Sequence, residues 1–229
     1  AAMHDLWHRG CSRHAMASSE ITLEAVPSIG EVSAEDWNAC ANPAGIADLG
    51  LSSALSGDCS GLSTPAYNPF VSHAFLSAAE KSGSATARTG WGPRHLIAKV
   101  DGKVAGVVPC YLKSHSQGEY VFDRGWADAY ERAGGRYYPK LQVSVPFTPA
   151  TGPRLLVRDG VDRERIMEAL ASGLVALCGV SKASSVHVTF AREAQWKLLA
   201  GHGFLQRTDQ PFHGTTEVFP RFDEFLATL

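Results

Sequence analysis

The segment between residues 114 and 140 concentrates the side chains of this sequence that could do chemistry. Four of the six tyrosines and a loop histidine, His115, lie there among several acids. The tyrosines are Tyr120, Tyr130, Tyr137 and Tyr138, and the charged residues among them are Glu119, Asp123, Asp128, Glu131 and Lys140. Carboxylates beside aromatic rings favour a cationic or sugar-like ligand, and histidine has the ordinary pKa of a general base. This pattern predicts a ligand site.

Several of these residues also have a structural interpretation. Asp123 precedes a predicted helix and could cap it, whereas Trp126 and Tyr130 have the spacing of core residues. A lone loop histidine such as His115 is more often solvated than catalytic. His187 alternates with apolar neighbours in a predicted strand, so it faces either a cleft or a covering helix.

Composition excludes several classes of protein. The chain has 229 residues and 45% hydrophobic content, which is enough to bury a core. Its 21 basic and 23 acidic residues argue against a nucleic-acid-binding surface. No apolar run reaches the roughly 18 residues of a membrane span. Five widely spaced cysteines without a C-x-x-C pair indicate free thiols, which predicts a soluble intracellular protein.

The amino end has the composition of a leader. Residues 1–19 carry two arginines and a single acid, which is typical of the remnant of a transit peptide for plastid or mitochondrial import. His4, His8, Cys11 and His14 have the spacing of metal ligands. The leader interpretation is favoured over the metal site, and no metal is expected.

Periodicity and turn signals predict an α/β fold with a mixed, partly antiparallel sheet flanked by helices. It occupies a domain over residues 20–219 with a Gly/Ser-rich loop at 41–66. The predicted helices cover residues 33–40, 68–82, 126–133, 163–178 and 192–200. The predicted strands cover residues 94–100, 104–112, 119–123, 140–147, 155–157, 185–190 and 204–208. Asp101-Gly102 is the turn of a hairpin between the first two strands.

The last residues have the pattern of an amphipathic helix. Phe222, Phe225, Leu226 and Leu229 follow i, i+3, i+4, i+7 spacing, without a glycine or a cap to end the helix. Residues 220–229 are therefore interpreted as the start of a helix that leads to a missing second half. A protein partner that covers residues 222–229 would serve the same purpose.

Three blocks of the chain resemble a known family. SHSQGEYVFD, WADAYERAGGRYYPKL and VPFTPATGPRLL are similar to the FemAB-like acyl-CoA N-acyltransferases, often labelled peptidoglycan biosynthesis or recognition proteins, within the GCN5-related N-acetyltransferase (GNAT) superfamily. The likeness runs from NPFVSHAFL at residue 68 to FDEFLATL. The resemblance implies two acetyltransferase-like halves in tandem, of which this chain covers the first. It also implies acyl-CoA as a possible cofactor and a small-molecule amine, sugar or peptide as acceptor.

Transfer of an acyl group from a thioester to an amine requires a proton acceptor for the amine and an acid for the leaving thiolate. By that resemblance, the catalytic candidates are His115, Tyr120, Asp128 and Tyr138.

The cofactor requires a cradle of backbone N–H groups, for which Thr151, Gly152 and Arg154 are the candidates. The superfamily signature R/Q-x-x-G-x-G/A is missing, however. Loop 148–154 has one glycine and two prolines that donate no N–H, and loop 158–162 has one glycine and two carboxylates.

The weak cradle predicts an N-acyltransferase-related domain that is the acceptor-binding half rather than a complete enzyme. The alternative is a non-catalytic GNAT-like binding module or a structural subunit of a larger assembly.

Overall fold

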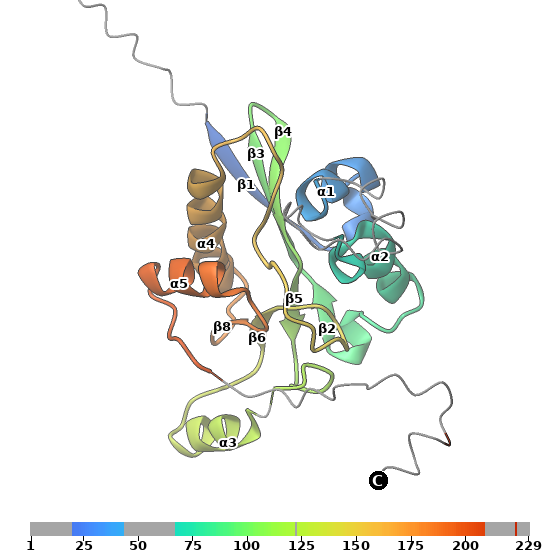
Figure 1. The fold of residues 1–229 in the computed structure, drawn as a ribbon. Coiled ribbons are helices and arrows are strands. Elements are labelled where there is room, and N and C mark those ends of the chain that lie inside the picture. The colour runs from blue at the N-terminus through green and yellow to red at the C-terminus, as the bar shows by residue number, and fades with distance from the viewer. Residues whose placement is uncertain (1–19, 44–66, 122, 209–222, 224–229) are drawn as a thin grey trace, which may run out of the picture.

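The chain forms two four-stranded sheets that share interrupted strand paths (Figure 1). The computed structural model describes residues 20–43, 67–121, 123–208 and 223. The predicted leader, most of the Gly/Ser-rich loop and the helix predicted over 220–229 lie outside these residues. One sheet has the order β1-β3-β4-β7 and the other β2-β5-β6-β8.

The strand paths break where the ladder cannot continue. Strand β2 (Trp91–Pro93) is separated from β3 (His95–Val100) by one residue, and β4 (Lys103–Val108) is separated from β5 (Cys110–Lys113) by Pro109. A proline has no N–H to donate and interrupts a ladder. The predicted hairpin between β3 and β4 is confirmed, and its Asp101-Gly102 turn has the positive φ angles that favour this dipeptide.

The remaining strands complete a mixed architecture. Strand β1 (Ile21–Val26) pairs antiparallel with β3, β7 (Leu156–Val157) with β4, and β6 (Lys140–Val143) with β5. Among the strands that the structure describes, only β8 (Val186–Val188) is parallel to its partner, which is β6. The expected α/β fold with a mixed, partly antiparallel sheet is confirmed.

Helices cover both faces of the sheets. Figure 1 shows α4 (Arg163–Val180) and α5 (Glu193–Gly201) on one side, and α1 (Ala34–Ala41) and α2 (His73–Lys81) on the other. Helix α3 (Arg124–Arg132) lies apart at one end. The predicted cap of α4 is confirmed, because the Asp162 side chain accepts a hydrogen bond from the Arg165 N–H.

The two larger hydrophobic clusters of the described residues follow from this layering. The first packs the sheet against α4 and includes Leu96, Leu141, Val143, Leu170 and Leu174. The second lies under α1 and α2 and includes Trp37, Val71, Leu76, Ile97 and Val107. Within the described residues, no helix is both long and apolar enough to cross a membrane.

Two predicted strands are wrong. The described residues of this range, 119–121 and 123, form no strand, because Tyr120 adopts a positive φ and the acids Glu119 and Asp123 turn inward to a buried lysine. Residues 204–208 also form no strand, and Leu205 is 95% exposed. Strands β1 and β2 were not predicted.

We predict that Gly106→Val destabilises the fold by about 1–3 kcal/mol, since overpacking displaces core side chains. A Cβ at Gly106 would lie 2.6 Å from Ile166 Cγ2 and 3.0 Å from Leu170 Cδ1, where α4 packs on β4. Gly179→Ala lies on α4, with no atom within 4 Å of the new Cβ; it is the control and should not destabilise the fold. Urea unfolding measures both, and equal stability of the two variants would contradict this packing.

Candidate functional site

One face of the second sheet carries a buried polar layer. Strand β6 alternates, so that Leu141 and Val143 enter the core while Lys140 and Gln142 point to the opposite side, followed by Ser144. These three polar side chains are all buried. Such a face requires polar partners from elsewhere in the chain.

The neighbouring strands extend this layer. Lys113 on β5 is the cross-strand partner of Lys140, and Gln142 lies between Tyr111 on β5 and His187 on β8. Two lysines directly opposite each other repel. Both are buried, so the layer depends on counter-charges that the sheet itself does not supply.

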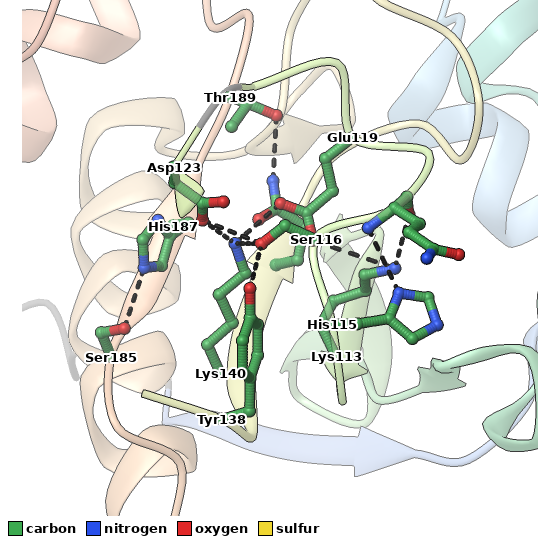
Figure 2. A network of polar contacts seen from close by, with 12 residues as sticks. Lys113, His115, Ser116, Glu119, Asp123, Tyr138, Lys140, Ser185, His187 and Thr189 are labelled. Atoms are coloured by element: carbon green, nitrogen blue, oxygen red, sulfur yellow. Dashed lines mark hydrogen bonds and ion pairs between the residues drawn. The ribbon is translucent and has the colours of Figure 1, made fainter. Parts of the chain in front are cut away.

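The segment after β5 supplies those counter-charges (Figure 2). The Lys140 Nζ lies 2.7 Å from Glu119 Oε2, 2.6 Å from Asp123 Oδ2 and 2.9 Å from Ser116 Oγ. The Lys113 Nζ donates to the Gln117 carbonyl at 3.0 Å and lies 3.8 Å from Glu119 Oε1.

Aromatic residues complete the surroundings. Lys113 Nζ stacks 3.5 Å above the Trp91 ring. The Tyr137 hydroxyl donates to Asp123 Oδ2 at 2.9 Å, and the Tyr138 hydroxyl lies 2.8 Å from Ser116 Oγ. We call Lys140, Glu119, Asp123, Ser116, Tyr137 and Tyr138 the lysine network.

Burial and nearby charges shift the pKa values of the network and of its neighbours Lys113 and His187 in opposite directions. Burial alone would raise the pKa of Asp123, but hydrogen bonds from Lys140, Ser116 and Tyr137 outweigh it and leave that pKa below its usual value. Burial dominates at Glu119 and raises its pKa despite the nearby lysines. Burial also lowers the pKa of Lys113 to about 7. Burial and the charge of Lys140 lower the pKa of His187 to about 4, so its ring is neutral at pH 7.

The layer leaves some acceptors unused. Among the described residues, no hydrogen-bond partner reaches the buried Glu119 Oε1, Asp123 Oδ1, Gln142 Oε1 or Ser144 Oγ. The carboxylate and amide oxygens can only accept hydrogen bonds. The complementary group is therefore a donor, such as an ammonium, an amine or a hydroxyl.

The structure places the four predicted catalytic residues in different surroundings from one another. Tyr138 belongs to the lysine network. His115 lies apart from it, since its Nδ1 accepts from the Gln117 N–H and its ring lines a cavity of about 580 Å³ beside Trp91. Tyr120 and Asp128 are exposed, and within the described part of the chain neither forms a hydrogen bond or ion pair with the network.

The structural interpretation of three residues in this segment differs from the structure. The Asp123 side chain makes no capping bond, although it occupies the N-cap position of α3. Trp126 and Tyr130 are 60% and 49% exposed and do not belong to the core. The role of Ser116 was not predicted, because a loop serine carries no periodic signal.

The predicted cofactor residues are bonded within the chain. Thr151 is exposed, and the Gly152 N–H donates to the Phe190 carbonyl. Arg154 is fully buried, and its guanidinium donates to the carbonyls of Thr189 at 2.9 Å and Ala150 at 2.7 Å. Burial lowers its pKa to about 10. Arg154 therefore links the chain before β7 to the chain after β8 by hydrogen bonds.

A glutamine side chain binds backbone groups in the same region. Gln195 of α5 accepts from the N–H groups of Arg154 and Leu155, at 2.7 Å and 3.2 Å, and donates to the Leu155 carbonyl at 2.6 Å. The start of α4 carries its own capping carboxylate, Asp162. The backbone donors that would cradle a pyrophosphate are thus engaged, and these residues do not fit coenzyme A.

No group of three or more histidines, cysteines or acids is arranged to hold a metal ion in the part of the chain that the structure describes. The candidate ligands His4, His8, Cys11 and His14 lie outside it.

We predict that Lys140→Met lowers the free energy of unfolding by about 3–5 kcal/mol, because it leaves two buried carboxylates without their counter-charge. Lys99→Met, which removes a surface lysine paired with the exposed Glu24 at 2.6 Å, should cost less than about 1 kcal/mol. Denaturant unfolding at pH 7 measures both. A Lys140 variant as stable as the Lys99 variant would show that the network contributes nothing to stability.

We also predict a pH dependence caused by Lys113. Between pH 7 and pH 10 the unfolded chain binds a proton at this lysine that the folded chain has released, so the free energy of unfolding rises with pH. Lys113→Met removes this rise, whereas Lys99→Met keeps it. Unfolding at pH 7, 8.5 and 10 measures the effect, and parallel pH profiles for the wild type and the Lys113 variant would contradict it.

Comparison with known proteins identifies a family. Residues 28–229 match the model of the FemAB-like family, described as peptidoglycan biosynthesis/recognition. No curated protein matches the chain in sequence.

Solved structures of acetyltransferases are similar to this chain at low sequence identity. A ribosomal-protein-alanine N-acetyltransferase from Brucella melitensis is 12% identical, with a TM-score of 0.42 over 86% of this chain and 99% of that one. A Trypanosoma brucei acetyltransferase is 12% identical, with a TM-score of 0.42 over 86% and 100%. A glucosamine-6-phosphate N-acetyltransferase from Arabidopsis thaliana is 9% identical, with a TM-score of 0.39 over 86% and 99%. Because the family model matches most of its length, the chain belongs to the FemAB-like family.

Proposed function

We propose that this chain is the acceptor-binding half of an N-acyltransferase, which presents an amine of a sugar- or peptide-containing acceptor to an acyl or aminoacyl donor held elsewhere. The observation that carries the proposal is the lysine network, a buried set of acidic oxygens already arranged around one ammonium group, Lys140 Nζ. Membership of a family described as peptidoglycan biosynthesis/recognition supports an acceptor that combines sugar and peptide.

The unused oxygens of the network indicate where an amine would be held. Glu119 Oε1 and Asp123 Oδ1 accept no hydrogen bond among the described residues, although each carboxylate binds Lys140 through its other oxygen. A primary amine is a donor of the kind these oxygens lack. In this proposal the acceptor amine approaches the acids that already neutralise Lys140.

A row of aromatic rings leads from the surface to these acids. The exposed Tyr130 ring lies 6.2 Å from the Tyr137 ring, which lies 5.0 Å from that of Tyr138 and 5.9 Å from that of His187. Aromatic rings with a polar tip bind ligands that are apolar on one side and wet on the other. This row would therefore hold a sugar or peptide with its amine toward Asp123.

Two groups at the site could take the proton of the acceptor ammonium. Burial raises the pKa of Glu119, and a general base works best when its pKa lies closer to neutral pH. His187 is neutral at pH 7 and its Nε2 lies 2.9 Å from Ser185 Oγ. No step is assigned to coenzyme A, because Gln195 Oε1 already accepts from the backbone N–H groups of Arg154 and Leu155, which would otherwise be donors for its phosphates.

A non-catalytic binding module is the second candidate function. The observation that favours it is that Gln195 occupies the backbone N–H groups of Arg154 and Leu155. In this candidate function the chain recognises the acceptor and does not bind the donor. The two candidates share the acceptor site and differ only in whether transfer follows.

Calorimetry of the chain with a disaccharide-peptide released from peptidoglycan by a muramidase tests the proposal. We expect the wild type to bind this ligand and Tyr138→Phe to bind it several-fold more weakly, since its hydroxyl is lost from Ser116. Tyr67→Phe, another half-buried tyrosine, is the control and should not change affinity.

Acetyl-coenzyme A is titrated in parallel, with no binding expected. Binding of acetyl-coenzyme A would overturn the assignment as an acceptor half, and failure of the disaccharide-peptide to bind would remove the proposed acceptor.

A further inference from the structure

A second cavity, of about 600 Å³, lies where η1 (Ile29–Glu31), α2 and η4 (Ala87–Thr89) meet the β2–β5 edge of the second sheet. Most of its lining is small or apolar, with Ile29, Ala85, Pro93, Leu112 and Pro139 among the residues that contribute. It is large enough for a ligand of about two or three amino-acid residues. None of the lysine network residues lines it.

Two cations line this cavity without a counter-charge. Arg94 is half-buried, and its Nη1 donates to the Pro93 carbonyl at 2.7 Å. Lys81 lies in the last turn of α2. Among the described residues, neither Arg94 nor Lys81 has a carboxylate within ion-pair distance. A half-buried guanidinium keeps its remaining donors for a ligand, and its planar fork matches a carboxylate.

The one acid that lines the cavity is engaged elsewhere. Glu80 accepts from Ser28 Oγ at 2.8 Å, from the Ile29 N–H and from His95 Nε2 at 2.8 Å. Since His95 Nδ1 accepts from the Cys110 N–H, its proton lies on Nε2, which donates to Glu80. Burial raises the pKa of Glu80, but these hydrogen bonds outweigh it and leave the pKa below its usual value.

This arrangement separates the charges. The Glu80 carboxylate is held by donors from η1 and β3, so it does not pair with Arg94. The cavity therefore combines an apolar wall, an unpaired guanidinium and the hydroxyls of Ser77 and Ser114. A ligand that matches it has a small apolar body and an anionic end.

We infer that this cavity binds the carboxylate end of a peptide with small apolar side chains, with Arg94 as the residue that holds the carboxylate. The choice of a peptide rests on the proposed function, in which the acceptor contains peptide. Pro139 of the cavity lining stands between Tyr138 and Lys140 in the chain, and Ser114 stands beside Lys113. The cavity and the lysine network are thus joined through the same two strand ends.

Calorimetry of the full chain with N-acetylalanylalanine tests this inference. We expect the dipeptide to bind the wild type, and we expect at least a tenfold loss of affinity when its carboxylate is replaced by an amide. Arg94→Met should cause a similar loss for the acid and no further loss for the amide.

The matched control is Arg158→Met. Arg158 is also half-buried and also donates to one backbone carbonyl at 2.7 Å, that of Val104, but it does not line the cavity. This variant should bind the dipeptide as the wild type does. Ser114→Phe, at an exposed position of the lining, should block binding by size and keeps the test valid if the Arg94 variant fails to fold.

Two outcomes would overturn the inference. Equal binding of the acid and the amide would exclude a carboxylate site, and competition by inorganic phosphate at concentrations well below those of the dipeptide would assign the site to a phosphate group instead. Tyr138→Phe separates this inference from the proposed function, because it should leave dipeptide binding unchanged. Dipeptide binding that depends on Arg94, without any binding of the disaccharide-peptide, would support the cavity and remove the proposed function.

Discussion

The ammonium of Lys140, held in the interior by two carboxylates, is the interaction on which the second sheet depends. A buried charge is tolerated only when its partners are close and hydrogen-bonded, and Lys140 Nζ lies within 3 Å of three oxygens. Those oxygens come from the segment after β5, so the ion pairs also determine the course of that segment. Tyr120 takes a positive φ between the two acids, and α3 begins directly after Asp123.

This requirement explains why the tyrosines gather on one side of the molecule. Tyr137 and Tyr138 precede Lys140 in the chain, and both of their hydroxyls bond to oxygens that also hold its ammonium. The aromatic row is therefore anchored by the same charges that stabilise the strand.

At the other end of the sheet the backbone is bonded within the chain. Gly152, Arg154 and Gln195 connect the chain before β7 to the chain after β8 with hydrogen bonds, and among the described residues no carboxylate pairs with the buried guanidinium. These contacts stabilise the fold at the place where the family resemblance predicted a cofactor.

Sequence alone determined the elements whose signals are local. The Asp101-Gly102 turn, the Asp162 cap and the apolar stripe of α4 each depend on residues close together in the chain, and the structure confirms them. Local periodicity also placed Leu141 and Val143 in the core, and the quoted sequence blocks were sufficient to identify the family. The polar residues between 114 and 140 were identified as a group, but their roles were not.

Only the tertiary structure decided which of those polar residues meet. Tyr138 joins Ser116 and Asp123, whereas Tyr120 and Asp128 remain at the surface. The strand predicted over 119–123 failed for the same reason, because the desolvation of two lysines on adjacent strands draws both acids inward and overrides the local β propensity. Cross-strand register and burial set that demand, and neither is encoded in any short stretch of sequence.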